Sequence, residues 1–113
     1  MNEYDIVIIG AGPAGMMATI SAAQSNLRIL LLEKNLKAGR KLLLTGNGRC
    51  NLTNSLPVDE FIKGYGKTGK FLHSAFHHFF RDDLISFLKQ YGTQCKTEDT
   101  GLIYPKSDRA SDV

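Results

Sequence analysis

Three glycines near the start of the chain, Gly10, Gly12 and Gly15, have the spacing G-x-G-x-x-G. In a turn from a strand into a helix, this spacing predicts a binding site for the pyrophosphate of a dinucleotide. The first glycine allows the tight turn, the second lets the backbone approach the phosphates, and the third lets helix and strand pack closely. Pro13 suits the first helical turn, where no N–H is needed. The phosphates would lie at the helix N-terminus, whose free N–H groups favour negative charge.

The residues around the glycines predict the strand and helix that this site needs. Ile6–Ile9 is a continuous apolar run, as expected for a strand covered on both faces. Small residues from 16 to 25 predict a helix that can pack closely on a sheet, and residues 28–33 predict a second buried strand ending in Glu33. A carboxylate there can accept hydrogen bonds from a ribose diol and disfavours a 2′-phosphate. The alternative is a glycine-rich turn in an ordinary βαβ unit that binds no ligand.

Residues 34–69 form a long connection, and such connections are uncommon unless they have a function. The segment combines cationic side chains, glycines and side chains that form hydrogen bonds, which suits a phosphorylated polar cofactor. The residues concerned are Arg40, Lys41, Arg49, Gly39, Gly46, Gly48, Thr45, Asn47 and Asn51. The alternative is a solvated surface loop. For residues 63–70, where glycines alternate with lysines, we expect a flexible basic linker.

The last third of the chain predicts two short helices and a β-hairpin. Apolar residues recur at helical spacing over about 70–79 and 82–91, with Asp82 as a candidate cap and Gly92 as the end. We assign the phenylalanines of this region to the core, not to an aromatic ligand site. Residues 94–96 and 102–104 flank a hairpin turn. His73 and His77 share a helix face but lack a third ligand, so we expect no metal site.

Composition places the chain among globular proteins. It has 113 residues, 42% hydrophobic and 22% charged, with a net charge of +3. The basic residues alternate with glycines and not with aromatic residues, so we expect a phosphate-bearing ligand and no nucleic-acid partner. The N-terminus lacks a basic leader and no apolar run reaches the ~20 residues of a membrane span, so we expect no membrane association. Cys50 and Cys95 form no motif, which fits free thiols in the cytoplasm.

Only one βαβ unit can be read in the sequence, and a doubly wound sheet needs more parallel strands. We therefore expect residues 1–113 to be an incomplete dinucleotide-binding domain, the N-terminal part of a larger protein. The predicted fold class is α/β, with a βαβ unit, a long cofactor loop, two short helices and a hairpin.

The motifs resemble those of a known family, the BaiN-like (YhiN-like) flavoproteins, which are NAD(P)/FAD-dependent oxidoreductases that include aminoacetone oxidase. The most specific part of the resemblance is G-x-G-R-C-N-x-T-N at residues 46–54. The resemblance covers essentially the whole chain. One departure is that the family pattern has Gly-Arg before an aromatic-Pro pair, whereas this chain has Gly101-Leu102, so no arginine is available for a role there.

The resemblance implies an FAD site in which Gly12–Gly15 meet the pyrophosphate and Glu33 meets the adenosine ribose. It also implies that Arg40, Lys41 and the 46–51 loop lie along the cofactor, the loop toward the flavin end. The full set of expected cofactor residues is Gly10, Gly12, Pro13, Ala14, Gly15, Glu33, Lys34, Arg40, Lys41, Gly46, Asn47, Gly48, Arg49, Cys50 and Asn51.

The expected function is that of the FAD-binding region of a flavin-dependent oxidoreductase, with NAD(P)H as a candidate electron donor and an unidentified small molecule as substrate. Alternatives are the nucleotide-binding domain of an NAD-dependent dehydrogenase, which the long loop after Glu33 disfavours, and a non-catalytic nucleotide-binding module. No catalytic residue is identified. Cys50 is a candidate thiolate because cations lie near it in sequence, or a small residue lying against the cofactor. By itself the chain is expected to be inactive and to self-associate.

Overall fold

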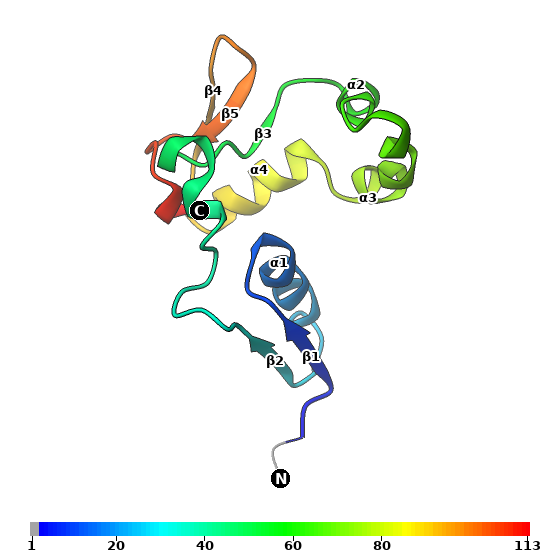
Figure 1. The fold of residues 1–113 in the computed structure, drawn as a ribbon, viewed down its shortest axis with the longest axis vertical. Helices are drawn as coiled ribbons and strands as arrows, with labels where there is room; N and C mark the ends of the chain where they lie inside the picture. Colours follow the sequence, from blue (N-terminus) through cyan, green and yellow to red (C-terminus); the bar gives the residue numbers. More distant parts are fainter. Residues whose placement is uncertain (1–2) are drawn as a thin grey trace. The chain divides into compact units, whose positions relative to one another are not determined.

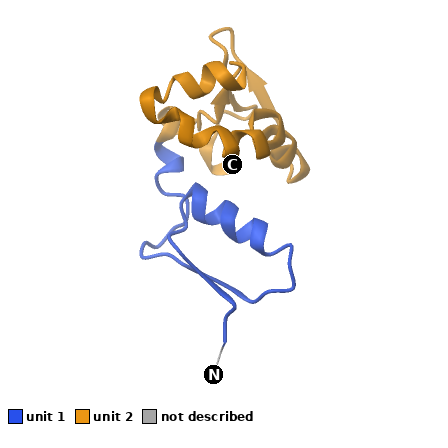
Figure 2. Ribbon diagram, turned by 90° about the vertical axis from the view of Figure 1, so that its right-hand side faces the viewer, with its two compact units in different colours: residues 1–44 blue, residues 45–113 orange. Residues whose placement is uncertain are grey.

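The computed structural model describes residues 3–113. They divide into two compact units, residues 1–44 and residues 45–113, shown in different colours in Figure 2. None of the helices in residues 3–113 is long and apolar enough to cross a membrane.

The first unit is a βαβ unit, as predicted. Strand β1 (Ile6–Ile9) is followed by helix α1 (Pro13–Ala22) and strand β2 (Ile29–Leu32). The two strands are parallel, in a register that pairs Ile6 with Ile29 and Ile9 with Leu32, and α1 packs on both (Figure 1). The apolar runs and the small residues between them therefore form the two strands and the helix that the sequence predicted.

The sheet of the first unit is covered on one face only, so the predicted burial of Ile6–Ile9 on both faces is wrong. Successive strand residues point to opposite faces. Ile6 and Ile8 are half-buried, whereas Val7 is 51% and Ile9 85% exposed. Leu32 of β2 is also exposed. Within residues 3–44, α1 is the only helix that packs on the strands, and a single helix covers a single face.

The second unit is built on a three-stranded antiparallel sheet. Strands β4 (Cys95–Thr97) and β5 (Leu102–Pro105) form the predicted hairpin, and a short strand that the sequence did not reveal, β3 (Thr53–Asn54), pairs with the other edge of β5. The helices are α2 (Val58–Lys63), α3 (His73–His78) and α4 (Arg81–Gln90). The 3₁₀ segments are η1 (Leu42–Gly48), η2 (Gly66–Leu72) and η3 (Ala110–Asp112). Residues 45–47 inside η1 are not helical. The most deeply buried side chains of the unit are Cys50, Ile62, Leu88, Ile103, Tyr104, Pro105 and Ala110.

Helix α4 begins one residue earlier than predicted and is capped differently. The Asp83 carboxylate accepts a hydrogen bond from the Phe80 N–H at 2.9 Å, which satisfies a donor at the helix N-terminus. Asp82, predicted as the cap, instead accepts a hydrogen bond from the Arg81 side chain at 3.0 Å. Gly92 follows the helix with a φ of +93°, the left-handed conformation that commonly ends helices.

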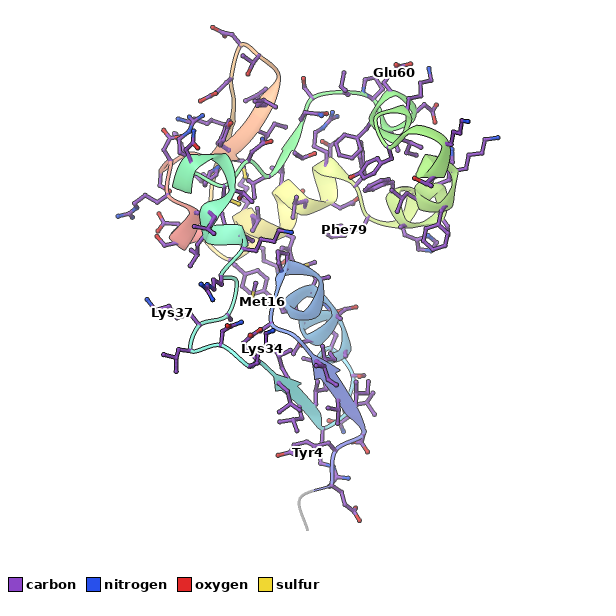
Figure 3. The ribbon with its side chains drawn as sticks, in the orientation of Figure 1. Tyr4, Met16, Lys34, Lys37, Glu60 and Phe79 are labelled. Atoms are coloured by element: carbon purple, nitrogen blue, oxygen red, sulfur yellow. The ribbon has the colours of Figure 1, made fainter. Side chains whose placement is uncertain are left out.

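The flexible linker predicted for residues 63–70 is wrong, because the segment is packed. Gly69 is buried, and a Cβ built there would lie 2.3 Å from the Ile62 carbonyl oxygen. Phe61 of α2 packs edge-on against Phe76 and Phe80, with ring centroids 5.3 and 5.2 Å away. These rings support the assignment of the phenylalanines to the core, although Phe71 is exposed, and so is Phe79, which Figure 3 labels.

Gly69→Ala is expected to loosen α2 and η2, because the new methyl group would overlap the Ile62 carbonyl. Overpacking of this kind destabilises by roughly 1–3 kcal/mol, so amide hydrogen exchange in residues 58–72 should accelerate about fivefold to a hundredfold. Gly64→Ala is the matched control, since its Cβ would lie 3.2 Å from the nearest atom, the Phe61 carbonyl oxygen. Equal exchange rates in the two variants would contradict the packing.

Candidate cofactor site

Two of the three motif glycines are required by the fold of the first unit itself. Gly10 has a φ of +96°, which side chains rarely adopt, and its N–H donates to the Leu32 carbonyl at 2.7 Å. A Cβ at Gly15 would lie 1.8 Å from the Gly10 carbonyl oxygen, so only glycine lets α1 start this close to β1. Both assignments made from the spacing agree with this geometry.

Gly12 is different, because nothing in residues 3–113 requires a glycine there. Its φ of −77° is open to any residue, and a Cβ built on it would meet no atom within 4 Å. Neither backbone conformation nor packing explains the missing side chain. A ligand that approaches the backbone closely does explain it, as the spacing predicts for a pyrophosphate.

The N-terminus of α1 next to Gly12 is suited to an anion. Pro13 occupies the first helical turn, where it has no N–H to satisfy, and no side chain caps the helix. Among residues 3–113, the N–H groups of Gly12, Ala14 and Gly15 donate no hydrogen bond. The first turn contains no acidic residue. These donors and the helix macrodipole favour a negatively charged group beside the backbone of Gly12, where no side chain blocks its approach.

Glu33 lies at the same turn. One carboxylate oxygen accepts the Ala11 N–H at 2.8 Å, and the other accepts the backbone N–H and the side-chain amide of Asn35 at 2.8 and 2.6 Å. The hydrogen bonds from Asn35 and Ala11 lower the pKa of Glu33, so the carboxylate is ionised at neutral pH. One lone pair, on the oxygen that accepts from Ala11, remains to accept a ribose hydroxyl group.

A cationic pocket of about 500 Å³ follows β2 directly in the chain. Its lining residues are Lys34, Asn35, Leu36, Lys37, Arg40 and Leu43. Figure 3 labels Lys34 and Lys37 on this loop. The Gly39 N–H donates to the Ala11 carbonyl at 2.7 Å and thereby ties the loop to the glycine turn. The structure thus places Lys34 and Arg40 around one pocket, and Lys41 is exposed outside its lining.

The other predicted cofactor residues belong to the second unit, where residues 45–50 form a tight turn. Asn47 and Gly48 have φ values of +55° and +85°, and the Arg49 N–H donates to the Gly46 carbonyl at 3.1 Å. This is the type I′ geometry, for which Asn-Gly is a preferred pair. The Cys50 N–H donates to the Thr45 carbonyl at 3.0 Å and closes the base of the turn. Asn47 and Gly48 form its exposed tip.

The three residues that follow the tip, Arg49, Cys50 and Asn51, are buried or bonded within the second unit. Cys50 is 3% exposed, and burial raises the pKa of its thiol, the opposite of what a reactive thiolate requires. The Asn51 side-chain amide donates to the Thr53 and Ile103 carbonyls at 3.0 and 3.1 Å. The Arg49 guanidinium pairs with Glu98 and Asp108, two residues that the sequence did not single out. Both cysteines are free, as predicted, and residues 3–113 contain no cluster of three or more metal-ligating side chains.

Comparison with known proteins decides the family. Residues 4–113 match the family model described as the HI0933-like protein Rossmann domain. The chain belongs to this family. The match confirms the resemblance to the BaiN-like (YhiN-like) flavoproteins and the α/β Rossmann-like fold class.

Several characterised proteins are similar to this HI0933-like chain. A 3-dehydro-bile acid delta(4,6)-reductase of Clostridium scindens is 37% identical over 110 residues, 96% of the chain and 26% of that protein. A ribosomal RNA dihydrouridine synthase of Escherichia coli is 36% identical over 104 residues, 92% of the chain and 26% of that protein. A thioredoxin reductase of Ureaplasma parvum is 47% identical over 63 residues, 53% of the chain and 20% of that protein. The chain therefore spans about a quarter of the length of the first two relatives.

Proposed function

We propose that the chain is the FAD-binding N-terminal region of a flavin-dependent oxidoreductase. The observation that carries the proposal is Gly12, whose missing side chain neither backbone conformation nor packing explains. The free N–H groups of α1 and the ionised Glu33 beside Ala11 support it, because they offer donors to a pyrophosphate and acceptors to a ribose.

In this proposal each predicted residue of the first unit has a defined task. The N–H groups of Gly12, Ala14 and Gly15 bind the pyrophosphate, and Glu33 binds the adenosine ribose. Lys34 and Arg40 supply positive charge at the pocket after β2, and Lys41 adds to it from outside. When bound, FAD supplies the hydride chemistry, and the protein binds and orients it. NAD(P)H is the proposed electron donor.

Residues 4–113, which match the family model, do not identify the substrate. The bile acid reductase and the ribosomal RNA dihydrouridine synthase are 37% and 36% identical to the chain, although their names specify chemically unrelated substrates. We propose that the difference between these substrates lies outside the region that matches both. We propose that residues 1–113 are an incomplete domain of a longer cytoplasmic protein and are inactive alone.

The proposal is tested by purifying the full-length protein and identifying the cofactor that it retains. We expect flavin absorbance and, after denaturation, release of FAD in a ratio close to one per chain. The NAD-dependent dehydrogenase alternative predicts a colourless protein that binds NAD. A protein that retains no flavin and binds no added FAD would overturn the proposal.

Glu33→Gln is expected to weaken FAD binding by the full-length protein about tenfold to a hundredfold. The change removes the charge from the hydrogen bond to the ribose, and charge-assisted bonds contribute roughly 1.5–3 kcal/mol. It also sets the glutamine amide against the N–H donors of Ala11 or Asn35, which now donate to the carboxylate. Glu60→Gln is the control, because Glu60 (labelled in Figure 3) is an exposed carboxylate of α2. It pairs only with Lys63 of the same helix among the ion pairs of residues 3–113. Flavin fluorescence titration measures both affinities. Unchanged affinity in Glu33→Gln would refute the ribose assignment.

A further inference from the structure

The 3₁₀ segment η2 in the second unit presents three rows of side chains, because residues three apart lie on the same side of a 3₁₀ helix. The segment packs on α2 and α3 (Figure 1). The row of Gly69 faces this packing, since a Cβ there would lie 2.3 Å from the Ile62 carbonyl oxygen of α2. The other two rows contain Lys67, Lys70 and Phe71, and all three side chains are exposed.

The exposed rows combine two lysines with an uncovered aromatic ring. Lys67 and Lys70 share one row, and Phe71 lies in the adjacent row. Phe71 is 88% exposed, more than any other phenylalanine or any tyrosine in residues 3–113. An exposed ring beside two cations offers a stacking surface and positive charge in one place.

The charges of Lys67 and Lys70 are not matched within residues 3–113. Neither lysine forms an ion pair there, whereas Lys63, the preceding cation, pairs with Glu60. Residues 61–81 contain no acidic side chain. This part of the second unit therefore favours an anionic partner.

Helix α3 extends the exposed rows with imidazole rings. His73 follows Lys70 by three residues and begins α3. Its ring stacks on that of His77, with the ring centroids 6.0 Å apart and the planes at 19°. His77 is exposed. Imidazole and phenyl rings are among the side chains on which the unpaired bases of nucleic acids stack.

We propose that these five residues form a binding surface for a single-stranded nucleic acid. The surface, here called the η2 face, consists of Lys67, Lys70, Phe71, His73 and His77. The lysines bind backbone phosphates, and Phe71 stacks on a base. A single strand fits better than a duplex, whose bases stack on one another and offer no free face to a ring. A membrane fits less well, because interfacial binding needs a broad apolar face and Phe71 is the only apolar member of the η2 face.

The sequence led us to expect no nucleic-acid partner, because its basic residues alternate with glycines and not with aromatic residues. In the structure Gly69 points inward against α2, and Phe71 lies at the surface next to the lysines. The order of residues along the chain therefore does not describe their order on the surface. The structure favours a partner that the sequence pattern disfavoured.

The experiment measures binding of a fluorescein-labelled oligothymidylate to the full-length protein by fluorescence anisotropy. A length of about 16 nucleotides covers the site sizes of single-strand-binding folds. The double change Lys67→Gln and Lys70→Gln should weaken binding at least about tenfold at low salt. It should also reduce the slope of log affinity against log salt by about 1.4, or about 0.7 for each lost phosphate contact.

The matched control is the double change Lys89→Gln and Lys106→Gln, which removes the same charge from the second unit. Both lysines are exposed, lie outside the η2 face and form no ion pair in residues 3–113. We expect this control to bind oligothymidylate nearly as well as the wild-type protein. Flavin content should be the same in all variants, because none of them changes the proposed FAD site.

Phe71→Leu tests the stacking contact, because it keeps an apolar side chain and removes the ring. Stacking of one base on an aromatic side chain corresponds to about a fivefold to hundredfold gain in affinity, and we expect this to be lost. The salt slope should stay unchanged, since no charge is removed. Circular dichroism melting curves check that each variant is folded, and the exposure of all the replaced side chains predicts unchanged melting temperatures.

Failure of the wild-type protein to bind oligothymidylate would overturn the proposal. Equal losses in the two lysine pairs would also overturn it, because they would indicate only a general attraction to positive charge. Wild-type affinity in the folded Phe71→Leu protein would rule out the stacking contact and with it the assignment to a nucleic acid. Binding to phosphatidylserine vesicles but not to oligothymidylate, weakened by the same changes, would assign the η2 face to a membrane instead.

Discussion

Gly12→Val is expected to strip FAD from the full-length protein while leaving the protein folded. The backbone at Gly12 accepts a side chain without strain, and a Cβ there would meet no protein atom within 4 Å. The valine side chain would instead occupy the surface in front of the α1 N-terminus, where we place the pyrophosphate. Because phosphate binding by backbone N–H groups requires direct contact, we expect affinity to fall by at least about a hundredfold.

The controls for this prediction are Gly12→Ala and Gly15→Ala. Alanine at position 12 adds one methyl group and should weaken FAD binding less than valine does. Alanine at position 15 would place a Cβ 1.8 Å from the Gly10 carbonyl oxygen and should therefore lower thermal stability as well as FAD content. The measurements are flavin content after gel filtration and the circular dichroism melting curve. A folded Gly12→Val protein with wild-type FAD content would rule out the pyrophosphate assignment.

The second large effect is expected for residues 1–113 purified by themselves, which should self-associate and show no tight FAD binding or turnover. The exposed face of the two-stranded sheet presents Val7, Ile9 and Leu32, with Ile9 85% exposed. Both strands are also edge strands, whose unpaired backbone groups pair readily with other chains. Apolar faces of this kind seek partners. A two-stranded sheet by itself is at best marginally stable.

Light scattering coupled to gel filtration measures the association, and flavin fluorescence measures FAD binding. Ile9→Lys should shift the chain toward the monomer, because it places a charge on the exposed apolar face. Leu36→Lys is the control, since Leu36 is fully exposed on the loop after β2 and lies outside the sheet. A wild-type monomer that binds one FAD tightly would contradict this prediction. It would show that residues 1–113 need no further strands to stay monomeric and no further residues to bind FAD.

Individual strands and helices could be predicted where one hydrophobic pattern dominates the segment. The apolar runs and glycine spacing predicted β1, α1 and β2, and the helical spacing predicted α4 to within one residue. The packing of residues 63–70 was not predicted, because lysines and glycines there have the composition of a linker. Gly69 is a glycine for close packing on Ile62, and composition does not distinguish packing from flexibility.

In the candidate site too, some residues could be understood from the local sequence and others only from the fold. The roles of Gly10 and Gly15 follow from a short motif, since the turn and the helix lie within a few residues of each other. Arg49 could not be understood from its neighbours, because its partner Glu98 is 49 residues away and is brought to it by the β4–β5 hairpin. Only the fold shows that this cation is already paired.

The hydrogen bond between Glu33 and Ala11 limits how the cofactor preference of this chain could be re-engineered. A designer seeking a 2′-phosphorylated dinucleotide would replace the carboxylate to remove charge repulsion. The same carboxylate accepts the Ala11 N–H at 2.8 Å, and Ala11 is buried inside the glycine turn. A replacement without an acceptor at that point would leave a buried donor unsatisfied. In the proposed site, the preference for the ribose and the shape of the glycine turn are therefore linked, and they would have to be redesigned together.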